Sequence, residues 1–489
     1  MIDLTINEKV LENARTRARE RNIIIPTFEQ QKNPKTLVPQ KIQQELSEIG
    51  LWDVNPLNLF RISWKNEPIE RGGGYQDLAN YIELPPALTG VEARIIALVG
   101  KYFPTGSHKV GAAFSCLVPR LVTGQFDPIN QKAVWPSTGN YCRGGAYDSH
   151  ILACESVAIL PEEMSKERFE WLKTVAGEVI ATPGSESNVK EIYDKCHELT
   201  KERGDDIVIF NQFDEFGNHL WHYDVTGNAI KEVLYKELHG SKYRGCVFTT
   251  GSAGTIGSGD FLKEQYPQSF IAAGESVQCP TLLENGFGAH RIEGIGDKHV
   301  PWVHNVKNTD FVVAIDDQDA MNWVRLFNEP AGMKYLKDEI GVSEKLVNQL
   351  HLLGISSMAN VLFAIKMAKY YEMTNKDVIV TVFTDSMEMY QSRVVELREQ
   401  LGEYSPTKAA IDYHRSIKGI KTDYMLELSY QQKKRVHNLK YFTWIEQQGK
   451  TMEELNRQWY DDNYWSNIHT MTPQLDTLIN KFNQKVGLL

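Results

Sequence analysis

One lysine and three short turns hold the residue types in this sequence that could do chemistry. Lys109 closes the segment PTGSHK at 104–109 and is followed by the small, apolar stretch 110–114. That stretch should carry the lysine side chain toward an interior cleft, where an amine shielded from water loses its proton more readily and can attack a carbonyl carbon. A lone lysine in a loop is more often a solvated surface charge, so this assignment depends on the turns that follow.

The second turn, STGN at 137–140, directly follows an expected strand at 133–135. Hydroxyls and backbone N–H groups gathered at the start of a helix form an anion site that suits a carboxylate. The alternative interpretation of the same residues is an ordinary helix N-cap.

The third turn, TGSAGTIG at 250–257, follows an expected strand at 246–250. Its glycines would let backbone amides approach a phosphate closely at a helix N-terminus. It lacks the Lys-Ser/Thr pair of a P-loop, and its Gly-x-x-Gly-x-x-Gly spacing differs from that of dinucleotide-binding turns. A phosphate held without a lysine fits a cofactor that stays bound.

The elements between these turns predict an α/β fold. Short apolar strands alternate with amphipathic helices such as 165–175 and 189–202. Strands separated by helices of this length form right-handed crossovers in a mainly parallel sheet, and a break near 225–245 should separate two such sheets. The expected strands lie at 133–135, 157–160, 178–182, 207–211, 246–250, 270–274 and 378–383.

In this order, the turns resemble those of the fold-type II pyridoxal-phosphate (PLP) enzymes, the tryptophan synthase β-like superfamily, and they are nearest to its cysteine synthase and cystathionine β-synthase branch. The family pattern is a Pro-x-Gly-Ser-x-Lys loop, then Ser-Gly-Asn, then a glycine-rich phosphate loop. The resemblance covers roughly residues 95–395. Its further matches are QF at 212–213, WHYDVTG at 221–227, IEGIG at 292–296, GISS at 354–357 and TDS at 384–386.

The resemblance implies two three-layer α/β/α domains with mainly parallel sheets, plus a helical C-terminal extension. We expect an N-terminal layer at 1–95, a smaller α/β domain at 96–228 with Lys109 and the carboxylate turn, and a larger one at 229–399 with the phosphate turn. The aromatic-rich extension at 400–489 should pack on the body or on a second subunit. Its alternative is a simple surface appendage.

Carried over residue by residue, the resemblance assigns Lys109 as the Schiff-base lysine and proton shuttle, and Ser386 as the serine that meets the pyridine nitrogen. In this chain, the family's loop for the substrate carboxylate corresponds to Ser137, Thr138, Gly139 and the amide of Tyr141. Gln212 matches a glutamine near the substrate. The other positions that resemble cofactor contacts are Asn140 at the phenolic oxygen, Gly251, Ser252, Ala253, Gly254 and Thr255 at the phosphate, and Gly354 beside the imine.

These residues imply PLP-dependent β-elimination or β-replacement on a β-substituted L-amino acid through an aminoacrylate, with Lys109 removing the Cα proton. Ser386, unlike an aspartate, would not hold a proton on the ring nitrogen, which favours elimination over transamination. The alternatives are a serine or threonine ammonia-lyase, a PLP subunit of a thiolase-type complex, and a non-catalytic scaffold. The presence of both Lys109 and Ser386 argues against a scaffold, which needs neither.

Positions around the first two turns depart from the family pattern or stay ambiguous. Tyr141 stands where a small threonine is usual, at the expected mouth of the substrate pocket. Arg143 could meet an acidic group on the substrate, and its alternative is a surface arginine one turn into a helix. His108 is expected to orient its loop rather than carry protons.

Composition argues against several other functions. The net charge of −10 opposes the basic face that nucleic-acid binding needs, and no apolar run approaches the ~20 residues of a membrane span. The six cysteines form no CxxC pair, which indicates reduced thiols and no metal site. The N-terminus is charged and lacks the apolar core of a signal peptide. We expect a cytoplasmic homodimer with a small amino-acid substrate, no nucleic-acid or membrane partner, and a possible heterologous partner subunit.

Overall fold

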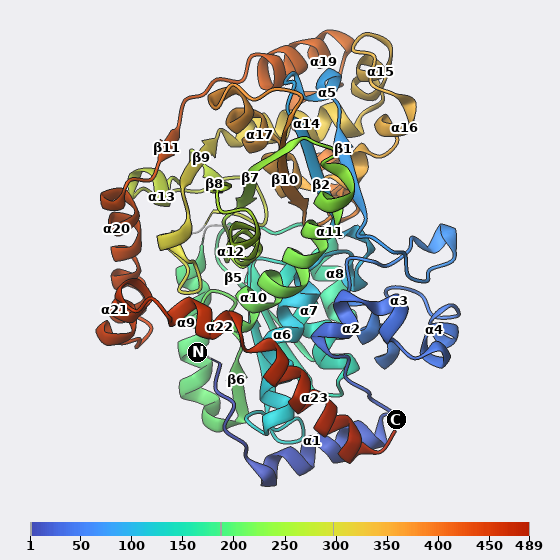
Figure 1. Ribbon diagram of the computed structural model, residues 1–489, viewed down its shortest axis with the longest axis vertical. Helices are drawn as coiled ribbons and strands as arrows, with labels where there is room; N and C mark the ends of the chain where they lie inside the picture. Colours follow the sequence, from blue (N-terminus) through green and yellow to red (C-terminus); the bar gives the residue numbers. More distant parts are fainter. Residues whose placement is uncertain (1, 186–187, 297, 489) are drawn as a thin grey trace.

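Two β-sheets organise the chain in this computed structural model, which describes residues 2–185, 188–296 and 298–488 (Figure 1). The smaller sheet has the order β5-β4-β3-β6 and is parallel throughout. The larger has the order β1-β2-β10-β7-β8-β9-β11 and is parallel from β2 to β9, with antiparallel strands at both edges. The strands are β1 (Tyr81–Leu84), β2 (Arg94–Val99), β3 (Lys132–Pro136), β4 (Glu155–Pro161), β5 (Glu178–Thr182), β6 (Ile207–Ile209), β7 (Lys242–Thr249), β8 (Phe270–Ser276), β9 (Phe311–Ile315), β10 (Asp377–Phe383) and β11 (Met425–Glu427).

Both faces of the larger sheet are buried. Along β2, Ile96 and Leu98 belong to one hydrophobic cluster, and Ile95, Ala97 and Val99 belong to the cluster on the opposite face. Successive side chains of a strand point to opposite faces, so this alternation requires helices on both sides of the sheet. The expected three-layer α/β/α architecture with mainly parallel sheets is confirmed.

Helices pack on both sheets and form the outer layers. Those of the N-terminal region and the smaller sheet are α1 (Glu8–Glu20), α2 (Phe28–Lys32), α3 (Pro34–Leu37), α4 (Gln40–Leu46), α5 (Pro86–Thr89), α6 (Lys109–Thr123), α7 (Asn140–Ile151), α8 (Lys166–Val175), α9 (Val189–Arg203), α10 (Phe216–Trp221) and α11 (Gly227–Glu237). Those of the larger sheet are α12 (Ile256–Gln265), α13 (Thr281–Glu284), α14 (Asp317–Asn328), α15 (Pro330–Asp338), α16 (Glu344–Val347), α17 (Ile355–Tyr370) and α18 (Gln391–Leu401). The last helices are α19 (Pro406–Tyr413), α20 (Tyr430–Asn438), α21 (Met452–Tyr460), α22 (Tyr464–His469) and α23 (Thr472–Val486).

The division of the chain differs in detail from the expected one. Each expected strand is present, and the expected break near 225–245 lies between β6 and β7, which belong to different sheets. The expected boundary at residue 95, however, falls inside β2, and both β1 and β2 join the larger sheet beside β10. The N-terminal region is therefore more than a layer on the core. The extension at 400–489 also supplies the edge strand β11.

The C-terminal extension packs on the body of the molecule rather than standing free. Trp444 and Trp465 are buried in a cluster with Trp302 and Phe216 of the core. Beyond it, α23 lies beside α1, and Asn483 exchanges two hydrogen bonds with the backbone of Ile25 (Figure 1). The aromatic residues of the tail thus cover apolar surface of the same chain.

The cysteines and the lengths of the apolar helices bear on two expectations from the sequence. All six cysteines are buried and outside disulfides, which agrees with reduced thiols. Across the described residues, no single helix is long and apolar enough to cross a membrane. The segments Glu344–Leu352 and Ile355–Tyr370 are long and apolar enough only when taken together, and the chain bends by 119° between them.

Candidate active site

Lys109 reaches from the smaller sheet's first helix to the glycine-rich turn of the larger sheet. The residue opens α6, and its Nζ donates to Ser252 Oγ at 2.8 Å and to Gln212 Oε1 at 3.3 Å. The side chain is half-buried. Two residues that the sequence analysis assigned separately, the lysine and Ser252 of the phosphate turn, are therefore in direct contact.

Gln212 and Asn218 connect the lysine to both turns. Gln212 Nε2 donates to Ser137 Oγ at 3.2 Å, so this amide joins the lysine to the carboxylate turn. Asn218 Nδ2 donates to Ser252 Oγ at 3.0 Å and to the Gln212 carbonyl at 2.9 Å. Sequence reasoning missed Asn218, because an asparagine in a polar stretch six residues after Gln212 carries no pattern of its own.

The phosphate turn precedes the N-terminus of α12. Ala253 has φ 58°, a left-handed backbone that is uncommon outside glycine. Alternating right- and left-handed residues aim successive N–H groups into one concave site that suits an anion. A Cβ on Gly254 would overlap the Asn218 side chain, and a Cβ on Gly251 would lie 2.9 Å from the Gly294 carbonyl oxygen. These glycines are needed because other protein groups pack against the turn.

A hydrogen bond within the carboxylate turn and a contact with Arg168 stabilise the conformation of this turn. Ser137 Oγ accepts from the Gly139 backbone N–H at 3.1 Å, and α7 begins at Asn140. Gly139 has φ 157°, and a Cβ there would lie 2.5 Å from Arg168 Nη1. Tyr141, which stands where a small threonine is usual, has a buried ring that packs edge-on against Trp135 at 5.3 Å.

The turn after β10 places a carboxyl and a hydroxyl side by side. Asp385 Oδ2 accepts from Asn140 Nδ2 at 2.7 Å and from the Tyr390 hydroxyl at 2.6 Å, and burial raises the pKa of this carboxyl. Its Oδ1 occupies the space where a Cβ on Gly354 would stand. Ser386 Oγ is buried and has no hydrogen-bond partner within the described residues.

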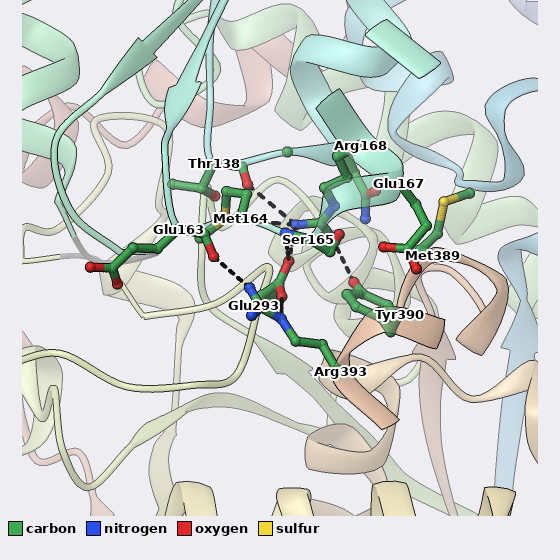
Figure 2. A network of polar contacts seen from close by, with 12 residues as sticks. Thr138, Glu163, Met164, Ser165, Glu167, Arg168, Glu293, Met389, Tyr390 and Arg393 are labelled. Carbon is green, nitrogen blue, oxygen red and sulfur yellow. Dashed lines mark hydrogen bonds and ion pairs between the residues drawn. The ribbon is translucent and has the colours of Figure 1, made fainter. Parts of the chain in front are cut away.

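A buried ion-pair network joins the carboxylate turn to the larger domain (Figure 2). Arg168 of α8 pairs with Glu293 Oε2 at 2.7 Å and donates to the Tyr390 hydroxyl at 2.6 Å and to the Thr138 carbonyl at 3.3 Å. Arg393 binds the other oxygen of Glu293 at 2.7 Å. Sequence reasoning missed this network, although Glu293 lies inside the matched IEGIG segment.

Arg143 is buried, so its interpretation as a surface arginine is wrong. The guanidinium lies over the rings of Trp171 at 4.5 Å and Trp52 at 5.4 Å, and it donates to Met389 Sδ. Burial and the neighbouring Arg168 lower its pKa to about 10. Within the described part of the chain it has no carboxylate partner.

His108 is enclosed by aromatic rings beside the lysine. Its imidazole lies 4.9 Å from the His222 ring and 5.4 Å from the Trp64 ring, and it is fully buried. Burial lowers the pKa of His108 to about 3, so the ring is neutral at ordinary pH. Neither ring nitrogen has a hydrogen-bond partner within the described residues, so the imidazole contacts its neighbours by packing, and its expected role in orienting the loop stays a prediction.

Several buried polar atoms at the site have no partner among the described residues, and they match what a pyridoxal phosphate offers. Ser386 Oγ and Asn140 Oδ1 are two such atoms. Leaving a buried polar group unpaired costs about 1–3 kcal/mol, so a ligand that satisfies both would be held by them. Together with the anion-binding turn at α12 and the Lys109 amine, the residues present fit that group.

The chain also resembles known proteins. A family model described as pyridoxal-phosphate dependent enzyme matches residues 82–335. The cystathionine beta-synthase of Saccharomyces cerevisiae is 27% identical over 322 residues, which cover 64% of this chain and 60% of the yeast protein. A probable cysteine synthase of Bacillus subtilis is 28% identical over 290 residues, covering 59% of this chain and 85% of that protein.

Solved structures share the fold at low sequence identity. A cysteine synthase from Entamoeba histolytica has a TM-score of 0.56 and 22% identity, covering 70% of this chain and 93% of that one. A hydrogen sulfide-producing enzyme from Fusobacterium nucleatum has a TM-score of 0.53 and 24% identity, covering 63% and 95%. The matched region of the family model ends at residue 335, so Gly354, Ser386 and the C-terminal helices lie beyond it.

Proposed function

This chain belongs to the family of pyridoxal-phosphate dependent enzymes, and on that premise we propose that it binds PLP at Lys109 and catalyses β-elimination or β-replacement on a β-substituted L-amino acid. The observation that carries the proposal is the contact of Lys109 Nζ with Ser252 Oγ at 2.8 Å in the glycine-rich turn. That contact brings an amine, an anion-binding helix start and, through Gln212, a carboxylate turn to one place.

The proposed roles follow from where each group lies. When bound, the cofactor supplies an electron sink for the bonds at Cα of the amino acid. The N–H groups of the turn at Gly251–Thr255 hold its phosphate, and Ser386 Oγ donates to its ring nitrogen. The backbone of the carboxylate turn, 137–141, binds the substrate carboxylate, and Gln212 orients Lys109.

Lys109 Nζ is placed to move protons. The amine is half-buried and donates hydrogen bonds to two neutral oxygen atoms, Ser252 Oγ and Gln212 Oε1. These contacts hold Nζ between the phosphate turn and the carboxylate turn. We propose that this nitrogen takes the Cα proton from the substrate and returns it to the leaving group or to the product.

Ser386 rather than Asp385 is the proposed partner of the ring nitrogen. Ser386 Oγ and Asp385 Oδ1 are both buried without a partner within the described residues. Asp385 Oδ2, however, already receives hydrogen bonds from Asn140 and Tyr390, and its Oδ1 lies against Gly354. A hydroxyl can donate to a neutral ring nitrogen without keeping a proton on it. The resulting weaker electron sink favours elimination or replacement at Cβ over transamination.

The substrate class is open within this proposal. Relatives of the chain are a cysteine synthase and a cystathionine beta-synthase, which supports an amino acid with a leaving group on Cβ. A buried Arg143 without a carboxylate partner supports an acidic group on that substrate, since an unpaired buried cation is costly. We also propose a homodimer, which light scattering on the purified chain would test.

The direct test of the proposed function is a substrate screen. Purified, PLP-loaded protein is mixed with serine, cysteine, O-acetylserine, threonine and acidic β-substituted amino acids, and both the cofactor absorbance and keto-acid or sulfide release are recorded. We expect at least one β-substituted amino acid to change the spectrum and to turn over. If the protein binds PLP but no amino acid perturbs its spectrum, the enzymatic proposal fails and the scaffold alternative is favoured.

A further inference from the structure

A cluster of two histidines and one aspartate lies where the C-terminal extension meets the core. His219 belongs to α10, Asp260 to α12 and His469 to α22. The Nε2 atoms of the two histidines are 3.0 Å apart, and each lies 3.7 Å from Asp260 Oδ2. His219 and Asp260 are buried, and the His469 side chain is 6% exposed.

The three donor atoms have the spacing of metal ligands. A triangle with sides of 3.0, 3.7 and 3.7 Å has a circumradius of about 2.0 Å, so one ion could sit at that distance from all three atoms. Zinc binds histidine nitrogen and carboxylate oxygen at ~2.0–2.2 Å. Larger cations such as Ca²⁺ need longer distances and more oxygen ligands, so the size and donor set select a first-row transition ion.

The two imidazoles approach through their edges. Their planes differ by 7° and their centroids are 5.2 Å apart. With the Nε2 atoms only 3.0 Å apart, the rings meet nitrogen to nitrogen rather than face to face. A neutral imidazole nitrogen has a lone pair that can bind a metal.

Groups around the cluster contact two of its three side chains, Asp260 and His469, whereas Nδ1 of His219 has no hydrogen-bond partner among the described residues. Asp260 Oδ2 accepts from Asn305 Nδ2 at 2.8 Å, and its Oδ1 accepts from Asn308 Nδ2 at 2.7 Å. The outer nitrogen of His469, Nδ1, lies 3.6 Å from Glu264 Oε1. Metal-binding histidines and carboxylates are commonly oriented by such outer hydrogen bonds and carboxylates.

The charge balance also favours a cation. Within 4 Å of the Asp260 carboxylate, the only basic side chains in the described ranges are the two histidines. A buried carboxylate is costly without a compensating charge, and a divalent ion between the three atoms would supply one.

We propose that His219, Asp260 and His469 form a zinc site that fixes the C-terminal extension to the core. An ion about 2.0 Å from all three atoms would lie in their plane, so a tetrahedral zinc with solvent as its fourth ligand would require the three side chains to shift slightly. The site is separate from the groups proposed to act at Lys109, and His469 lies beyond the region that the family model matches. Zinc would therefore stabilise this chain's own tail, where α22 packs on α10, and take no part in the amino-acid chemistry.

The test measures metal content and stability of the untagged, PLP-loaded protein. After incubation with zinc and exhaustive dialysis, wild type should retain about one zinc per chain by inductively coupled plasma mass spectrometry. His469→Gln and Asp260→Asn should each lower that content at least tenfold. His437→Gln changes a buried histidine of the same extension that bonds the Leu455 carbonyl, outside the cluster, and should keep the zinc.

Two readouts separate a metal site from a simple contact. Chelation should lower the melting temperature of wild type but not of His469→Gln, and Co²⁺ in wild type should give visible d–d bands beyond the cofactor band. The 3.0 Å contact could instead be a hydrogen bond between the two imidazoles. Wild type that retains no zinc, or variants that retain as much as wild type, would establish that hydrogen bond and overturn the metal site.

Discussion

Replacing Arg168 by methionine should separate the contribution of the interdomain ion-pair network to stability from its contribution to catalysis. The Arg168 side chain is fully buried, and its guanidinium serves Glu293, the Tyr390 hydroxyl and the Thr138 carbonyl. Methionine fills similar space but leaves the buried charge of Glu293 with Arg393 as its one ion-pair partner among the described residues. Removing one partner of a buried ion pair costs about 3–5 kcal/mol.

The same change should reduce catalysis, because Arg168 holds the carboxylate turn. Its guanidinium donates to the Thr138 carbonyl, and its Nη1 lies 2.5 Å from the position that a Cβ on Gly139 would take. Displacement of a positioned group by about 1 Å can cost on the order of 10²-fold in rate. We expect kcat/KM for the best substrate of the screen to fall about 100-fold, mainly through KM, at a temperature where the variant is folded.

Arg325→Met provides a matched control. Arg325 forms an equally buried pair with Glu329 in the larger domain, so the loss of unfolding free energy should be similar while kcat/KM stays within about threefold of wild type. The double variant Arg168→Met with Glu293→Gln removes the stranded charge and should recover stability but not activity. If Arg168→Met keeps wild-type kcat/KM, or if Arg325→Met loses as much, the positioning role of Arg168 is refuted.

Three further predictions test separate parts of the site. Gly254→Ala should lose PLP on dialysis, because a Cβ there overlaps Asn218. Gly74→Ala should keep the cofactor, because a Cβ there would meet only the flexible end of Glu67 at 3.7 Å; equal retention in both variants would mean that the phosphate lies elsewhere. Ser386→Ala should shift the cofactor absorbance, because it removes the proposed contact with the ring nitrogen, while Asp385→Asn should not shift it. A shift seen only in Asp385→Asn would assign that contact to Asp385 instead. Arg143→Met should raise KM about tenfold for an acidic substrate and leave KM for a neutral one unchanged, as expected for loss of a charged hydrogen bond; equal effects on both would make Arg143 structural.

Local patterns made much of this fold predictable. Each expected strand was a short apolar run next to a turn, and such runs fix strands whatever their partners are. The strands that were missed are β1, β2, β9 and β11. β2 and β9 are apolar runs with the same local signal as the predicted strands, so the sequence could have shown them. β1 and β11 are strands of four and three residues at the edges of the sheet, and only the fold shows where they pair.

The candidate site was predictable where a turn has its own signature. Lys109 and Ser252 were each singled out by their turns, and they prove to be in contact. Arg168 was not found, because a basic residue in an amphipathic helix normally faces solvent, and only the fold shows that this one is buried against Glu293. Arg143 and Tyr141 show the same limit, since their neighbours determine where their side chains point.

The central claim is that Lys109 carries the cofactor, and borohydride reduction followed by peptide mapping tests it most directly. The purified protein is loaded with PLP, reduced, digested and analysed by mass spectrometry, with Lys109→Ala treated in parallel. We predict one pyridoxyl group on the peptide containing Lys109 and none in the variant, which should still fold. A pyridoxyl group on Lys101 or Lys132, or equal labelling of the Lys109→Ala variant, would contradict the account.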